Sequence, residues 1–353
     1  MTKWEIKQKY GGVILGFWKY LFRRLIFLVL LIFGVATMVF IISHMVPSDP
    51  IVANLSQRNM NNPKLVEAFK QKWGFDQPLY IQYFKYIKAL CKGDMGISIR
   101  TGNSVLSDLK MNLPATLELS FISIIFATLF GILFGIISAT KRNRIADQIL
   151  RGVSIMGVSI PIFWFSLIVL YLLYFKLGWA PGPGRLSPFM EPPAHITGMY
   201  LIDSIITGNW ETAADSFKHL ILPSIVLGSF TMGLIARTTR SSLLEVLSSD
   251  YIRTAKAKGV GRKLLLMRHA LGNSMIPVLT VIGLGLANLL GGMVLVETIF
   301  AWPGIGQYAY QSVRALDFTA IIGVALLIAL NYVLINLVVD LLYGLIDPRV
   351  RLK

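Results

Sequence analysis

The sequence predicts an all-α integral membrane protein with six transmembrane helices. Hydrophobic residues make up 55% and charged residues only 15% of its 353 residues, and the mean hydropathy is +0.64. A soluble domain of this composition would expose large apolar patches. A bilayer core about 30 Å thick needs about 20 apolar residues in helical form, because backbone polar groups in lipid must bond within their own segment. The runs that meet this requirement are Leu25–Val46, Leu117–Ala139, Gly157–Leu177, Leu220–Ala236, Met275–Val296 and Phe318–Tyr343.

Small residues and prolines modify these runs. The run Leu220–Ala236 is the weakest, because it is short and has Pro223 near its start. Pro161 is expected to break the third run and to expose carbonyl groups to a cavity. Gly131 and Gly135 place small residues on one helix face. That spacing predicts close packing against another helix, with a pore wall as the second interpretation.

Basic residues set the predicted orientation. The 34 Lys and Arg residues outnumber the 18 Asp and Glu residues, which gives a net charge of +16. They cluster beside the apolar runs, so they indicate membrane orientation and not nucleic-acid binding. Most of them lie before residue 25, in 141–151, in 237–273 and after residue 343. Both termini are therefore predicted to be cytoplasmic.

The chain divides accordingly. Residues 1–24 form either an interfacial helix on the membrane surface or a partly ordered tail. The single cysteine, Cys91, cannot form an intrachain disulfide, so the fold is not cross-linked. The predicted segments are a cytoplasmic tail (1–24), a first transmembrane helix (25–46), an external loop folded as a cap (47–116), a five-helix core (117–343) and a second cytoplasmic tail (344–353).

The most informative segment is DYIRTAKAKGVGRKLLLMRHALGNSMIP, residues 250–277. Ser248 or Ser249 is expected to cap a short helix that begins near Asp250. Gly259 stands where a helix ends on a left-handed residue. Charge alone favours another interpretation, a basic cytoplasmic loop over anionic lipid. A second helix is predicted from residue 262 toward 273, with Leu264, Leu265, Met267 and Leu271 available for burial.

The string DYIRTAKAKG followed by RHALGNSMIP is similar to the EAA loop of binding-protein-dependent ABC importers, with Gly259 at its central glycine. Arg253-Thr254-Ala255 stands where the general motif has Glu-Ala-Ala, and this departure resembles the oligopeptide/dipeptide branch. The strings RRLIFLVLLIFGVATMVFIISHMVPSDP, NLPATLELS, GVSIPIFWFSL, HLILPSIVLG, VETIFAWPGIGQ and NLVVDLLYGLIDPRVR resemble the B-type permease subunit of that branch, in the same order. The resemblance covers residues 23–353.

The resemblance implies a type I ABC importer permease fold and a transport subunit that is not an enzyme. The implied partners are a second homologous permease subunit, two ATP-binding subunits, an extracellular or periplasmic solute-binding protein and the lipid bilayer. The implied location is the bacterial or archaeal plasma (inner) membrane. No cofactor is expected on this chain, because it has no G-x-x-x-x-G-K-[ST] loop to bind phosphates. ATP and Mg²⁺ would act in the partners, and no metal-ligand spacing is present.

Two candidate sites follow from the resemblance. Residues from about 249 to 260 are expected to form a coupling helix that docks in a cleft of the ATPase. Its buried side would carry Tyr251, Thr254, Ala255 and Gly259, and the remaining docking residues are Asp250, Arg253, Lys256 and Lys258. The basic members are expected at the rim, where charges affect association rate more than affinity. A possible external gate comprises Glu297, Trp302, Pro303 and Gly304.

Oligopeptides or dipeptides are the cargo that the resemblance implies. The alternatives are nickel or another small solute, or a stand-alone secondary transporter. A membrane enzyme would need a nucleophile, base or metal constellation, and the sequence shows none. Glu118 and Asp340 lie near the ends of apolar runs, where snorkelling or pairing costs little, so a structural role is favoured over a role in transport.

Overall fold

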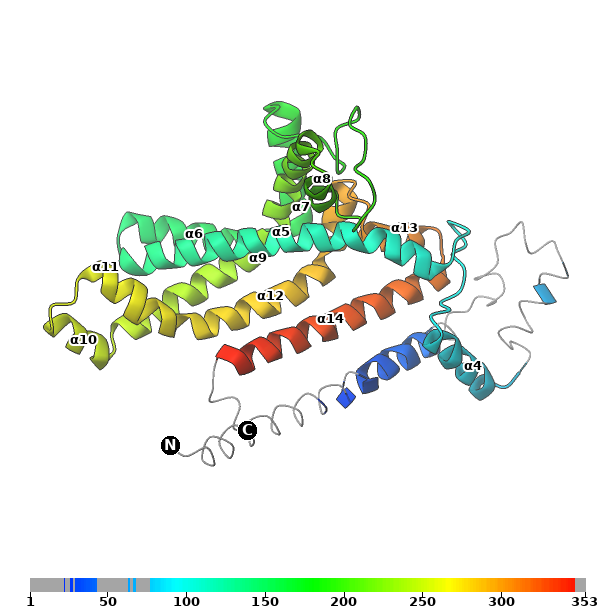
Figure 1. The fold of residues 1–353 in the computed structure, drawn as a ribbon, viewed down its shortest axis with the longest axis horizontal. Coiled ribbons are helices and arrows are strands. Elements are labelled where there is room, and N and C mark those ends of the chain that lie inside the picture. Colours follow the sequence, from blue (N-terminus) through cyan, green and yellow to red (C-terminus); the bar gives the residue numbers. More distant parts are fainter. Residues whose placement is uncertain are drawn as a thin grey trace. The chain divides into compact units, whose positions relative to one another are not determined.

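The computed structural model describes residues 77–346, residues 29–42 and the isolated positions 22, 26, 27, 63, 66 and 67. Apart from one antiparallel bridge between Ile97 and Ser104, every regular element in these residues is helical (Figure 1). Four helices in the described part are long and apolar enough to cross a membrane, or five if one bent pair counts as a single span. The predicted all-α class is confirmed. The number of six spans and the cytoplasmic termini remain predictions.

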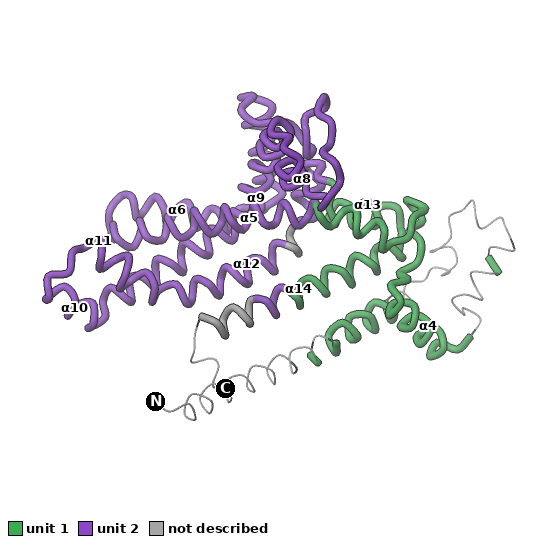
Figure 2. Tube along the Cα trace, in the orientation of Figure 1, with its two compact units in different colours: residues 1–114, 303–334, 352 green, residues 115–302, 335–351, 353 purple. Residues whose placement is uncertain are grey.

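The chain divides into two compact units (Figure 2). The described part of the first unit contains α4 (Leu79–Cys91), the start of α5 (Val105–Thr140), α13 (Ile305–Arg314) and most of α14 (Phe318–Ile346). The predicted first span is described only in part, as an apolar helix over Val29–Ile42. The core of this unit consists of Val105, Leu109, Ile305, Tyr308, Ala320 and Val324.

Two buried carboxylates organise the polar contacts of the first unit. Asp317 accepts hydrogen bonds from the Ser98 hydroxyl at 2.6 Å and from the Arg100 backbone N–H at 3.2 Å. Asp108 accepts from the Tyr308 hydroxyl at 3.1 Å. Because buried carboxylates need such donors, the loop before α5 is fastened to α13 and α14. This part of the predicted cap is ordered.

The second unit is built around α9, which spans Trp210–Leu247. It packs against α6, α8 and α12. The other elements of the unit are the rest of α5, α6 (Ile145–Ser159), α7 (Ile162–Val169), η1 (Leu170–Lys176), α8 (Tyr200–Ile206), α10 (Asp250–Ala257), α11 (Arg262–Leu264), η2 (Leu265–Ala270) and α12 (Leu271–Ile299).

Small residues let neighbouring backbones approach α9 closely. A methyl group added at Gly131 on α5 would lie 2.7 Å from Ile235. One added at Gly157 on α6 would lie 2.7 Å from the Ser229 carbonyl oxygen. Real Cβ contacts are not this short, so these positions accept only glycine without a shift of the helices. The close packing predicted for Gly131 and Gly135 is confirmed, because Gly135 also lies against Thr239 of α9.

Two predicted boundaries differ from the ends of the observed helices. Helix α5 begins at Val105, so the last residues of the predicted loop 47–116 are helical, and Pro114 lies inside the helix. Polar residues such as Asp108 and Asn112 hid this first part of the helix from a hydropathy criterion. The break predicted in the third run at Pro161 is confirmed. Helices α6 and α7 meet at Pro161 with a bend of 111°, and α6 begins before the predicted run.

The fourth run, predicted as the weakest, lies within the most deeply buried span. In the apolar window of α9, 78% of residues are buried, against 33% in that of α5. A helix surrounded by other helices contacts protein instead of lipid. Small and weakly polar residues suit such a helix, because they let its neighbours pack closely. The small and weakly polar residues of α9 are therefore consistent with its burial in protein.

The glycine contacts predict a matched pair of substitutions. Gly131→Ala should destabilise the protein by about 1–3 kcal/mol, because the new methyl group overpacks the contact between α5 and α9. Gly152→Ala on α6 adds the same group where no atom lies within 4 Å, and it should be neutral or slightly stabilising. Thermal unfolding of the detergent-solubilised proteins measures both. Equal melting temperatures for the two variants would contradict the packing described for α9.

Candidate functional site

The predicted short helix after Ser249 is present as α10, Asp250–Ala257. Its C-terminal end is a Schellman motif, in which the Gly259 N–H donates to the Lys256 carbonyl at 3.0 Å and the Val260 N–H to the Ala255 carbonyl at 3.2 Å. Gly259 has a φ of +80°, as this motif requires. The predicted N-terminal cap is wrong in one respect. Ser249 occupies the cap position, but its hydroxyl donates backwards to the Val246 carbonyl at 2.6 Å.

One buried side chain anchors α10 to the second unit. Ile252 is fully buried in an apolar cluster. Its buried neighbours come from the end of α5, from α9 and from η2: Ala139, Leu243, Leu265 and Ala270. The Tyr251 hydroxyl adds a polar link, since it donates to the His269 carbonyl at 3.2 Å and accepts from the Asn273 amide at 2.9 Å. Helix α10 is therefore held firmly on one face only.

The opposite face of α10 is open. The exposed members of the predicted docking set are Asp250, Tyr251, Arg253, Thr254, Lys256, Lys258 and Gly259. Ala255 differs, because it is half-buried and packs on the cluster of Ile252, so most of its surface faces its own chain. Of the apolar residues predicted for burial in the next helix, Leu265 is buried, while Leu264 and Met267 are 51% and 57% exposed. That expectation is wrong for these two residues.

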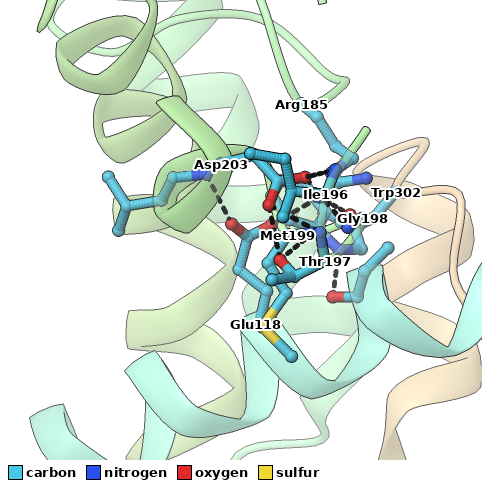
Figure 3. Close-up of polar contacts among 10 residues, drawn as sticks. Glu118, Arg185, Ile196, Thr197, Gly198, Met199, Asp203 and Trp302 are labelled. Carbon is cyan, nitrogen blue, oxygen red and sulfur yellow. Dashed lines mark hydrogen bonds and ion pairs between the residues drawn. The ribbon is translucent and has the colours of Figure 1, made fainter. Parts of the chain in front are cut away.

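A second polar site lies elsewhere in the same unit, around a buried ion pair (Figure 3). The Arg185 guanidinium donates to Glu118 Oε2 at 2.7 Å and to the Gly198 carbonyl at 3.0 Å. It also stacks 3.5 Å from the centre of the Tyr200 ring. Both charged side chains are less than a tenth exposed. The pairing predicted for Glu118 is confirmed; the side chain of Asp340 lies outside the described residues.

Asp203 secures the neighbouring loop. Its carboxylate accepts hydrogen bonds from the backbone N–H groups of Thr197 at 2.8 Å, Gly198 at 2.9 Å and Ile196 at 3.3 Å, and from the Thr197 hydroxyl at 2.6 Å. Burial alone would raise the pKa of Asp203, but these donors outweigh it and hold the pKa below its usual value. The loop therefore presents the Gly198 carbonyl to Arg185 in a fixed position (Figure 3).

The predicted gate residues Glu297 and Trp302 lie in the core of this unit. Glu297 is fully buried and accepts a hydrogen bond from the Thr116 hydroxyl at 2.6 Å. Trp302 is also fully buried, and its indole N–H donates to the Ala115 carbonyl at 2.8 Å. Between them Ala301 has a φ of +47°, which is strained for a residue with a side chain. Pro303 and Gly304 belong to the first unit, where Gly304 precedes α13.

Residues 131–352 match the family of binding-protein-dependent transport system inner membrane components. Residues 17–120 match the N-terminal region of such membrane components. The chain belongs to this family.

Relatives of this transport component cover nearly its whole length. It is 47% identical over 334 residues to the probable D,D-dipeptide transport system permease protein DdpB of Escherichia coli K12, covering 95% of this chain and 98% of the relative. It is 43% identical over 332 residues to the dipeptide transport system permease protein DppB of Alkalihalophilus pseudofirmus, covering 94% and 99%. These relatives are transport permeases and not enzymes.

The fold also resembles that of a solved ABC transporter. An inward-facing structure of the MetNI methionine ABC transporter aligns with a TM-score of 0.50 and 17% identity, covering 67% of this chain and 94% of that chain. At this identity the likeness concerns the fold alone.

Sequence reasoning missed Arg185 and Asp203 as organising residues of the permease component. Arg185 lies in a Pro- and Gly-rich loop, 67 residues from Glu118 in the chain. One signal was available, since a carboxylate at the end of an apolar run needs a partner of opposite charge. Only the fold shows which of the distant basic residues supplies it.

A substitution at Gly259 tests the end of α10. Gly259→Ala should weaken this helix end by about 1–2 kcal/mol, because a side chain disfavours positive φ. Gly261→Ala is the matched control, since Gly261 has a φ of −60° and both glycines have no atom within 4 Å of an added methyl group. Hydrogen exchange of the amides of residues 250–260 measures the difference. Equal protection in both variants would contradict the role assigned to Gly259.

Substitutions at the buried ion pair form a second test. Glu118→Gln or Arg185→Met should each cost about 3–5 kcal/mol, because each leaves an uncompensated buried charge or donor set. The double variant should lose less stability than the sum of the losses in the two single variants. A double-mutant cycle from thermal unfolding measures this coupling, with the exposed pair Asp250–Arg253 at 3.4 Å as a control that should contribute less than about 1 kcal/mol. Strict additivity at Glu118 and Arg185 would contradict the pairing.

Proposed function

We propose that this chain is the membrane permease subunit of an ATP-driven importer of oligopeptides or dipeptides. Its identity of 40–47% to dipeptide permease proteins over almost the whole chain is the observation that carries the proposal. Further named relatives handle di- or tripeptides and glutathione, which are also short peptides. The proposed location is the bacterial inner membrane, with both termini in the cytoplasm.

The proposed partners are a second homologous permease, two ATP-binding subunits and an external solute-binding protein. The geometry of α10 supports docking of an ATP-binding subunit. The helix is short, its C-terminal end is fixed by a Schellman motif, and Ile252 anchors one face while the opposite face stays open. A helix held in this way moves as a rigid element. It can therefore transmit a displacement caused by a partner to the rest of its unit.

The charges of α10 support a role for the rim residues. Arg253 is 75% exposed, and Lys256 and Lys258 are also exposed. Exposed charges steer association and are weakened by salt. We assign these basic side chains to contacts with an acidic rim on the ATP-binding subunit, and Thr254 and Gly259 to its cleft. Ala255 supports the helix from within.

The segment from Glu297 to Gly304 is proposed as the external gate. Support comes from the burial of Glu297 and Trp302 and from the strained backbone at Ala301. Strained and buried polar residues are costly, and they persist where a segment has a mechanical role. Deletion of this segment would remove core side chains, so point substitutions such as Trp302→Phe suit it better.

Reconstitution with the proposed partners tests the function. Proteoliposomes that contain the complete complex should accumulate a labelled dipeptide only when ATP and the binding protein are present. The variant Lys256→Glu/Lys258→Glu should lower this uptake at least about tenfold, since reversed charges oppose the rim contact by more than about 1.4 kcal/mol. Lys141→Glu is the matched control, an exposed charge reversal outside α10 that should leave uptake unchanged.

Two results would count against the proposal. Uptake of the dipeptide by this chain without ATP-binding subunits would show a stand-alone transporter. A complete complex that binds no peptide and accumulates another small solute would contradict the cargo.

A further inference from the structure

Asp147 is a buried carboxylate on which three helices converge. It lies near the start of α6 and has no exposed surface. Arg240 of α9 binds it with both prongs of its guanidinium, Nε at 2.9 Å from Oδ1 and Nη2 at 3.0 Å from Oδ2. The Ser138 hydroxyl at the end of α5 also donates to Oδ1. The Asn143 backbone N–H donates to Oδ2 at 2.9 Å.

This arrangement ties the elements together through charge. The bidentate fork is the strongest and most directional form of a carboxylate–guanidinium contact. Arg151 approaches the same carboxylate at 3.4 Å, but it lies on α6 itself and is 49% exposed. Arg240 is 21% exposed and lies 93 positions from Asp147 in the chain. The link between helices therefore depends on Arg240 and not on Arg151.

The link adjoins the anchor of α10. Leu243 lies three residues after Arg240, so the two share a face of α9. Leu243 is fully buried in the cluster that holds Ile252 of α10. Ala139, next to Ser138 on α5, belongs to the same cluster. Helix α6 contributes no residue to that cluster among the described side chains, and its polar connection to this region runs through Asp147.

We propose that Asp147 and Arg240 are positioning residues for energy coupling, which make α6 follow α9 when the docked ATP-binding subunit displaces α10. The inference rests on the proposed function for the source of the displacement. Helix α6 leads through the bend at Pro161 into α7. A motion passed to α6 therefore reaches the bent pair of helices. Without the ion pair, α9 would move with α10 and α6 would lag.

The glycine contacts between α6 and α9 are separate from this ion pair. They lie further along α6, where Ser154 meets Gly233 and Gly157 meets Ser229. Removal of the ion pair should leave these contacts intact. The pair therefore differs from a simple stabiliser, because a neutral replacement can retain the fold and still lose the link. Buried ion pairs replaced by apolar residues of similar size are often neutral or stabilising.

The experiment compares three variants in the complete reconstituted complex. Asp147→Asn removes the charge and keeps most of the shape. Asp147→Leu/Arg240→Met removes the pair without an unpaired buried charge, so it assembles even if Asp147→Asn does not. Both should lower the amount of dipeptide transported per ATP hydrolysed at least about fivefold. This is the lower end of the effects that coupled sites in proteins usually have on each other. Arg151→Gln is the matched control, and it should keep the ratio of the wild type.

A second readout does not depend on the cargo. Spin labels at the exposed positions Gln148 on α6 and Lys263 on α11, in a Cys91→Ser background, report the distance between these helices with and without ATP. The wild type and Arg151→Gln should keep one narrow distance distribution in both states. The two variants of the ion pair should show a broader or shifted distribution when ATP is added.

The outcomes separate this inference from the proposed function. If the wild-type complex moves no dipeptide while the distances behave as expected, the cargo is wrong and the positioning role stands. Normal transport per ATP and an unchanged distance in the neutral double variant would overturn the positioning role. Equal effects of Arg151→Gln and Asp147→Asn would overturn it as well, since a general loss of charge would then explain both.

Discussion

The second unit depends on how closely other helices can approach α9. Three helices present glycines or small residues where a side chain would collide with its backbone or with residues such as Ile235 and Thr231. In a membrane, apolar side chains gain little from leaving lipid, so such contact geometry supplies much of the specificity. This constraint explains the small and weakly polar composition of α9.

Two buried ion pairs in this unit hold different elements together. The Glu118–Arg185 pair holds the loop of residues 196–199 against α5, with Asp203 fixing the loop backbone. The Asp147–Arg240 pair ties α6 to α9 beside the cluster that anchors α10. Each charge is costly to bury and stays buried only because its partner is in place. Such pairs suit contacts between elements that must keep one arrangement while the protein changes conformation.

Local signals in the sequence were sufficient for some features. The helix at α10 and its end at Gly259 were predictable, because a left-handed glycine after a short basic helix is a property of neighbouring residues. The packing glycines of α5 were predictable from their spacing. The run within α9 was ranked weakest because it is short and has Pro223 near its start, and these features do not show that the helix is surrounded by protein. The start of α5 was missed because its first turns are polar.

Features that join distant residues were not predictable. Arg240 was counted only among the basic residues of 237–273, Asp147 was not considered, and no pattern within either segment identifies the other as its partner. Ala255 was assigned to the docking surface from the resemblance, but its small side chain packs on the core of its own chain. The sequence indicates which residue types α10 contains, and the fold determines which of them lie on its open face.

The most direct test of the account is a photo-crosslinking measurement from Ala257, an exposed position on α10. A photoreactive amino acid placed there in the native membrane should crosslink to an ATP-binding subunit, and the yield should change with bound nucleotide. This result would place the helix at the contact through which another protein's ATP hydrolysis drives the permease. Crosslinks to lipid alone, with or without nucleotide, would contradict the account and would leave α10 as part of a basic loop on the membrane surface.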